Sequence, residues 1–150
     1  MSKDFGIAGI RAGYAIMNEV RISKFIKNGF LWNSNGLAEY FFRLYTRSDF
    51  AESYELVRVQ YILETIDFVE KLLTVKQIKI YPSKANFVLV ELPQYISQDN
   101  FVALFLIRYG IYLRTCSDKI GLESGNFIRL ASRTKEENNY VIDCFLDFFK

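Results

Sequence analysis

The chain has 150 residues, of which 51% are hydrophobic, so it is long enough to bury the core of one domain without disulfide bonds. Its 19 basic and 17 acidic residues nearly cancel, which argues against a strongly basic surface for nucleic acids or anionic membranes. It contains no histidine, which excludes Ser-His-Asp and Cys-His catalysis and histidine-containing zinc sites.

The first half of the chain predicts one short strand and two helices. A glycine-rich stretch comes first, and residues 11–17 (RAGYAIM) then predict a short strand. A helix is expected over residues 37–46. A much longer amphipathic helix is expected over residues 50–73, where apolar side chains recur at spacings of three and four, and Ser48 or Asp49 can cap it.

The second half predicts elements in the order strand, strand, helix, strand, strand, helix. The strands are expected at residues 78–80, 86–92, 111–116 and 127–132. One helix covers residues 99–109 and ends at Gly110, the usual left-handed stop. The last helix begins after Thr134, which forms a capping box with Glu137. This order indicates an α/β layer rather than an all-helical bundle.

The cysteine content and the length of the apolar runs limit which metal sites, redox environments and membrane spans are compatible with the chain. Cys116 and Cys144 are too few for a disulfide framework or for a metal site made of cysteine alone, so we expect no metal and a reduced, intracellular protein. The longest purely apolar run, residues 101–107, is far shorter than the about 20 residues of a membrane span. No secretory signal is visible, so the expected location is the cytoplasm.

Residues 2–14 carry a pattern with chemical meaning, Ser-Lys-x-Phe-Gly-Ile-x-Gly-x-Arg-x-Gly-Tyr. A lysine amine, here Lys3, can form a Schiff base. The Ser2 hydroxyl and the Arg11 guanidinium can hold a phosphate by charge-assisted hydrogen bonds. The glycines let the backbone pass close to a bound molecule. Together these groups suit an aldehyde cofactor that bears a phosphate, which is pyridoxal 5'-phosphate.

This pattern resembles the cofactor-lysine signature of the class I/II aminotransferases of fold type I. The similar branch contains histidinol-phosphate aminotransferase and threonine-phosphate decarboxylase. The resemblance continues in chain order, at several separated motifs. These are PSKANFVLV at 82–90, GIYLRTC at 110–116, NFIRLA at 126–131 and TKEEN at 134–138.

The resemblance implies an α/β fold, namely the C-terminal small domain of a fold type I enzyme with helices packed on a small mixed sheet. A long helix and a remnant of the large domain precede it. The implied division is a cofactor-domain remnant at residues 1–30, a linking helical region at 31–75 and the small domain at 76–150.

The resemblance also assigns roles to individual residues. It makes Lys3 the Schiff-base lysine and proton carrier, with Ser2 and Arg11 as ligands of the cofactor phosphate. Arg129 resembles the arginine that binds the substrate α-carboxylate as a bidentate fork, which lysine could not reproduce. Arg114 resembles a second substrate-side arginine, suited to a distal phosphate. Each has a simpler alternative: a solvated charge for Lys3 and Arg11, and a structural ion pair for Arg129.

The sequence departs from the family before Lys3, where family members carry most of a large domain. The phosphate-cradling loop, the aspartate that pairs with the pyridine nitrogen and the aromatic that stacks on the ring have no candidates in this chain. Asp4 directly follows Lys3 and is a poor substitute. We therefore expect weak or absent cofactor binding and no efficient turnover by the chain alone.

Three functions remain open from the sequence. The leading interpretation is an aminotransferase acting on an anionic amino acid, such as a phosphorylated one, and a keto acid. The second is a decarboxylase of a phosphorylated amino acid, because residues 32–39 (WNSNGLAE) resemble that branch. The third is a non-catalytic aminotransferase-like domain used for dimerisation. We expect amino-acid and keto-acid substrates, a homodimer for the intact enzyme, and neither nucleic-acid nor membrane partners.

Overall fold

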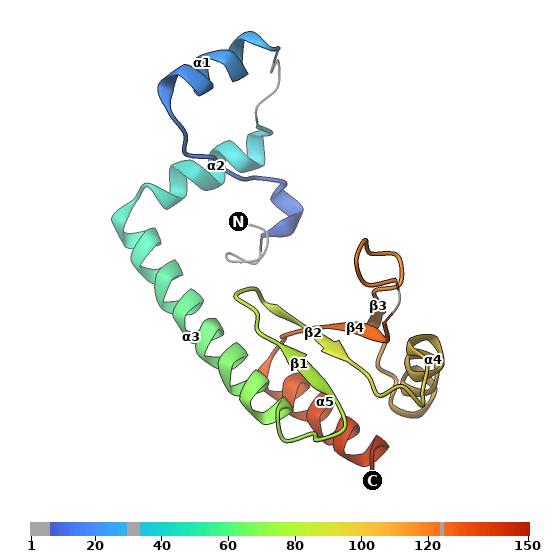
Figure 1. The fold of residues 1–150 in the computed structure, drawn as a ribbon. Helices are drawn as coiled ribbons and strands as arrows, with labels where there is room; N and C mark the ends of the chain where they lie inside the picture. The colour runs from blue at the N-terminus through green and yellow to red at the C-terminus, as the bar shows by residue number, and fades with distance from the viewer. Residues whose placement is uncertain (1–6, 30–33, 124) are drawn as a thin grey trace. The chain divides into compact units, whose positions relative to one another are not determined.

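The computed structural model describes residues 7–29, 34–123 and 125–150, and the chain folds as two compact units, residues 1–59 and 60–150 (Figure 1). Helix α3 (Ser48–Leu72) begins in the first unit and ends in the second. Of the helices in the described ranges, none is both long and apolar enough to cross a bilayer.

The first unit contains a short 3-10 helix, two α-helices and the start of α3. Their bounds are Ala8–Ile10 for η1, Glu19–Lys27 for α1 and Gly36–Tyr45 for α2. Asn35 caps α2 by accepting a hydrogen bond from the Ala38 N–H (2.9 Å), and its amide donates to the Ile10 carbonyl (2.8 Å). The ring of the buried Phe41 stacks on that of Tyr45, with centroids 6.0 Å apart. One amide side chain therefore joins η1 to α2.

Two features of this unit differ from the sequence expectations. The predicted strand at residues 11–17 is wrong, since this backbone has no regular secondary structure. A strand must pair its N–H and C=O groups with a neighbour, and the described part of this unit contains no other strand. Helix α1 is not predicted by the sequence analysis, although Asn18 caps it by accepting a hydrogen bond from Val20 N–H (2.8 Å) and Glu19 lies in its first turn.

The second unit contains a four-stranded sheet and two further helices (Figure 1). The strands are β1 (Lys79–Tyr81), β2 (Phe87–Glu91), β3 (Arg114–Thr115) and β4 (Phe127–Ala131), and the helices are α4 (Gln98–Tyr109) and α5 (Lys135–Phe148). The strand order is β1-β2-β4-β3, and all three pairings are antiparallel. The expected α/β class and order of elements are confirmed.

The sheet is antiparallel rather than mixed, for a topological reason. Strands β2 and β3 run parallel to each other and are connected through α4, as in a crossover unit. Strand β4 lies between them and pairs antiparallel with both, so the parallel strands are never neighbours. The capping box at the start of α5 is confirmed: Thr134 accepts from the Glu137 N–H, and the Glu137 carboxylate accepts from the Thr134 N–H.

The core lies on one face of the sheet. Alternate residues of the two central strands are buried there, together with aromatic and aliphatic side chains of α3, α4 and α5. The largest fully buried members include Val88, Val90, Ile128, Phe68, Leu72, Phe101, Phe105 and Phe145. Because strand side chains alternate between faces, the remaining residues of β2 and β4 point away from this core.

A buried polar network ties the end of β4 to α3 and α5. The Asn138 side chain accepts a hydrogen bond from the Arg133 N–H (2.8 Å) and donates to the Ser132 hydroxyl oxygen (3.2 Å). The Tyr61 hydroxyl donates to the Ser132 carbonyl (2.7 Å), and the Thr65 hydroxyl to the Ser132 Oγ (3.0 Å). Ser132 follows β4 directly, so this network holds the strand that carries Arg129.

Replacing Asn138 with alanine is expected to lower the free energy of unfolding by about 1–3 kcal/mol, because the hydrogen bonds of the buried Asn138 side chain to the Arg133 N–H and the Ser132 hydroxyl are lost. Asn139→Ala is the matched control: its side chain accepts from Lys71 Nζ (3.2 Å) in a more exposed setting, and its cost is expected to stay below about 0.5 kcal/mol. Urea unfolding monitored by circular dichroism measures both. Equal losses would show that the Asn138 network contributes no more to stability than the more exposed Asn139 contact.

A second network links α4 to α5. The Tyr109 hydroxyl donates to Asp147 (2.7 Å), and the Arg108 guanidinium contacts the same carboxylate (2.8 Å). Burial, together with the hydrogen bond to Asp147, raises the pKa of Tyr109 to about 12.

This shift predicts loss of stability in strong alkali. Between about pH 10 and pH 12 the folded chain retains the Tyr109 proton that the unfolded chain releases, so the free energy of unfolding falls as the pH rises through this window. Tyr109→Phe has no proton to lose and is expected to show a smaller fall across the same interval. Denaturant titrations at both ends of the window provide the measurement, and parallel pH profiles for the two proteins would contradict it.

Candidate functional site

The sheet face opposite the core, here called the open face, gathers charged and aromatic side chains. Residues directly opposite each other in antiparallel strands share a face, so the register identifies its members. They are Lys79 and Tyr81 of β1, Phe87, Leu89 and Glu91 of β2, Arg114 of β3, and Phe127, Arg129 and Ala131 of β4.

Two arginines lie side by side on the open face. Arg114 is directly opposite Arg129 in the β3–β4 pairing, which places their Cβ atoms about 5 Å apart. Arg114 is exposed and Arg129 is half-buried. Like charges directly opposite destabilise a sheet unless an anion compensates them. Among the described residues, no carboxylate forms a hydrogen bond or ion pair with either guanidinium, and Asp118 interacts with Arg114 only through longer-range electrostatics, so the arginine pair is a candidate site for an anionic ligand.

The Arg129 guanidinium lies over an aromatic ring. Its central carbon is 4.9 Å from the centroid of Phe87, a cation–π contact. Leu89 is the residue directly opposite Arg129, and Phe87 is two residues before Leu89, so Phe87 is a diagonal neighbour on the same face. Sequence analysis did not single out Phe87, although its place in the PSKANFVLV motif is the signal that could have done so.

Glu91, the carboxylate of the open face, binds Tyr81 and Lys79 rather than an arginine. Glu91 accepts a hydrogen bond from the Tyr81 hydroxyl (2.6 Å), and the Lys79 ammonium is 3.3 Å away. The Tyr81 hydrogen bond, followed by that of Lys79, lowers the pKa of Glu91. Its charge is therefore satisfied from β1, although β2 is the direct neighbour of β4 and Glu91 is two residues along from Leu89, the residue opposite Arg129.

The backbone N–H of Cys116, the residue after β3, donates to two acceptors and thereby holds this short strand in place. The Cys116 N–H donates to the Phe127 carbonyl (3.0 Å) and to the buried Gln98 side chain (3.2 Å). The thiol is buried, which raises its pKa, so it is a core residue without thiolate reactivity. Gln98 begins α4, and this contact fixes the short strand that presents Arg114.

Of the predicted cofactor ligands, the structure describes only Arg11. Ser2 and Lys3 lie outside the described residues. Arg11 closes η1 in the left-handed region (φ 55°), and its exposed guanidinium donates to the Ala8 carbonyl (3.1 Å). No described acidic side chain pairs with it, so most of its donors remain available for an anion. The Asn35 amide donates a hydrogen bond to the carbonyl of Ile10, which restrains the residue directly before Arg11.

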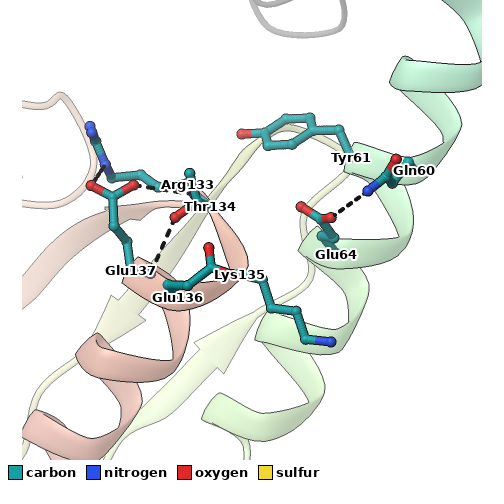
Figure 2. A pocket seen from close by; sticks show the side chains of 8 residues that line it. All are labelled: Gln60, Tyr61, Glu64, Arg133, Thr134, Lys135, Glu136 and Glu137. Atoms are coloured by element: carbon teal, nitrogen blue, oxygen red, sulfur yellow. Dashed lines mark hydrogen bonds and ion pairs between the residues drawn. The ribbon is translucent and has the colours of Figure 1, made fainter.

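An open polar pocket lies at the start of α5, between that helix and α3 (Figure 2). Its lining residues are Gln60, Tyr61, Glu64, Arg133, Thr134, Lys135, Glu136 and Glu137. The groups in it are largely satisfied by one another: Thr134 and Glu137 form the capping box, Arg133 pairs with Glu137 (2.9 Å), and Gln60 donates to Glu64 (3.0 Å). The arginine pair is the stronger candidate site.

The sequence profile of the family described as aminotransferase class I and II matches residues 1–145. The chain belongs to this family. Members of the class I and II aminotransferase family use pyridoxal 5'-phosphate, the cofactor that the sequence predicts.

Individual members of the family are similar over most of the chain. An L-serine phosphate decarboxylase of Campylobacter jejuni is 61% identical over 150 residues, which are 100% of this chain and 38% of that protein. A solved decarboxylase of Sulfurospirillum multivorans is 46% identical with a TM-score of 0.85, covering 97% of this chain and 41% of that one. A histidinol-phosphate aminotransferase of Clostridium acetobutylicum is 28% identical with a TM-score of 0.75, covering 97% and 43%. The chain thus spans about two fifths of the length of these relatives.

Proposed function

We propose that this chain supplies the cofactor lysine and the substrate-binding arginines of a pyridoxal-phosphate-dependent decarboxylase that acts on a phosphorylated amino acid. The Arg114–Arg129 pair carries the proposal, because two adjacent cations on one sheet face suit a small ligand with two anionic groups. The 61% identity to an L-serine phosphate decarboxylase supports it and favours decarboxylation over the amino transfer that leads the sequence interpretation. O-phospho-L-serine is therefore the first substrate to test.

In this proposal Arg129 binds the substrate carboxylate and Arg114 the distal phosphate. Guanidinium groups bind both anions through two parallel N–H···O hydrogen bonds, which fixes orientation as well as position. Arg129 is half-buried, so its pairing is screened less by water than that of the exposed Arg114. Binding both ends of the substrate orients the bond between Cα and the carboxyl carbon, and the phosphate contact provides binding energy away from the reacting atoms.

The cofactor would be held through Lys3, Ser2 and Arg11. The described part of this set fits, because the Arg11 guanidinium is exposed and makes a single described hydrogen bond, to Ala8. Pyridoxal phosphate bound there would supply an electron sink for the decarboxylation of the substrate. The Lys3 ammonium would donate to Cα the proton that replaces the carboxyl group, which leaves as CO₂ when its bond to Cα breaks.

A second candidate is amino transfer, which the similarity to a histidinol-phosphate aminotransferase supports. Both reactions begin with the same amino-acid complex and differ in which bond at Cα is broken. In a transaminase Lys3 would remove the Cα proton rather than deliver one. We expect either enzyme to work as a homodimer, which sedimentation of the purified protein tests.

Product analysis decides between the two reactions. Because the chain spans 38% of the Campylobacter jejuni decarboxylase, activity is best measured in a chimera in which residues 1–150 replace the matching segment of that enzyme. With O-phospho-L-serine we expect CO₂ and O-phosphoethanolamine in equal amounts. A keto-acid product that depends on added 2-oxoglutarate would instead support the transaminase. Turnover by the chain alone would contradict the expectation that the chain by itself is inactive.

A further inference from the structure

The contact between Arg129 and Phe87 has a role beyond packing. Arg129 faces a like charge from Arg114 across the strand pair and has no carboxylate partner among the described residues. A long side chain in that position, without a partner, would sample several rotamers. The guanidinium instead lies over the Phe87 ring, with its central carbon 4.9 Å from the ring centroid.

We infer that Phe87 is a positioning residue, which holds the Arg129 guanidinium ready for an anionic ligand. A carboxylate partner would also hold Arg129, but it would occupy the N–H donors that the ligand needs. An aromatic ring contacts the flat face of the guanidinium and leaves the donors in its plane free. The ring therefore restrains Arg129 without competing with the ligand. This inference rests on the proposed function for the identity of the ligand, but not for the contact itself.

The open face provides matched controls. Phe127 is on the same strand as Arg129 and the same face, but its ring makes an edge contact with Tyr81, with centroids 6.0 Å apart. Phe127→Leu therefore removes a ring of equal size from the same surface without touching the guanidinium contact. Phe87→Leu removes the positioning ring, and Phe87→Tyr keeps it, so the tyrosine variant should rescue whatever the leucine variant loses.

Nuclear magnetic resonance of the chain labelled with ¹⁵N-arginine tests the contact directly. A proton above an aromatic ring is shifted upfield, so the Arg129 Nε–H resonance, assigned by its absence in Arg129→Lys, is expected upfield of that of Arg114. The comparison of the two resonances is made within the wild-type chain, and the Arg129→Lys variant serves only to assign them. The shift is expected to disappear in Phe87→Leu and to persist in Phe87→Tyr and Phe127→Leu.

Binding of O-phospho-L-serine to the same samples tests the consequence. We expect Phe87→Leu to weaken binding by about 3- to 30-fold, with near wild-type affinity in Phe87→Tyr and Phe127→Leu. An Arg129 resonance without an upfield shift in the wild type, or equal affinity in Phe87→Leu and wild type, would overturn the inference. If the wild-type chain binds no O-phospho-L-serine, the proposed function loses its support on this chain, and the resonance alone decides the role of Phe87.

Discussion

Replacing Arg129 with alanine is expected to weaken binding of O-phospho-L-serine to the chimeric enzyme by about 30- to 300-fold, or about 2 to 3.5 kcal/mol. Arg129 is half-buried, and removing it leaves the substrate carboxylate beside the apolar Phe87 and Leu89 with one cation fewer. Arg129→Lys keeps the charge but loses the planar fork, so an intermediate loss is expected. Equilibrium binding of the substrate to the three proteins gives the measurement.

Arg133→Lys is the control for this experiment. Arg133 lies near the end of β4 and pairs with Glu137 (2.9 Å), so it is an arginine of the same region that points to a different partner. Its substitution is expected to leave binding within about twofold of wild type, in line with the small energies of surface ion pairs. Equal effects of Arg133→Lys and Arg129→Ala would remove Arg129 from the proposed substrate site.

Substitution of Arg114 tests which end of the substrate each arginine binds. If it binds the phosphate, Arg114→Ala weakens binding of O-phospho-L-serine and leaves the weak binding of L-serine unchanged. Arg129→Ala should reduce both, because both ligands carry the carboxylate. The opposite pattern would exchange the roles of the two arginines while leaving the pair as the anion site.

Replacing Lys3 with alanine is expected to reduce decarboxylation by at least about 100- to 10,000-fold, because the protein loses both the amine that attaches the cofactor and the donor of the proton to Cα. The rate of CO₂ release by the chimera measures the loss. Intact mass after borohydride reduction checks attachment independently: the wild-type mass should increase by that of the reduced cofactor, and the variant mass should not.

Lys76 provides the matched control for Lys3, since it is an exposed lysine of the second unit for which the described residues show no ion pair. Lys76→Ala is expected to retain both the mass increase and the rate. A Lys3→Ala variant that still decarboxylates at the wild-type rate would show that another group moves the proton.

How far the sequence predicts the structure differs between the two units. In the second unit the alternation of apolar residues, Gly110 and the Thr134 capping box predict every strand and helix in the right order. In the first unit the strand expected at residues 11–17 is absent, because apolar β-prone residues form a strand only beside a partner strand. Helix α1 is the reverse case, because the Asn18 cap and Glu19 in its first turn are local signals for a helix that the sequence prediction does not include.

The candidate site likewise contains residues that the sequence predicts and contacts that only the structure shows. The spacing of Ser2, Lys3 and Arg11 leads to these residues, because an aldehyde cofactor with a phosphate calls for an amine and a cation in a glycine-rich setting. Arg114 and Arg129 follow only from the resemblance to the family. The sequence does not reveal that Phe87 lies under one of these arginines. It also gives no sign that Glu91 is engaged by Tyr81 and Lys79 rather than by an arginine.

By itself the sequence determined the family, the cofactor and the order of elements in the second unit, because these follow from residue types and their spacing along the chain. Only the tertiary structure decided that Arg114 and Arg129 are direct neighbours on one face. That outcome depends on β4 entering the sheet between β2 and β3, a pairing between segments far apart in the chain. Strand order is set by how the helices and sheet bury a common core, and no local pattern in either strand specifies it.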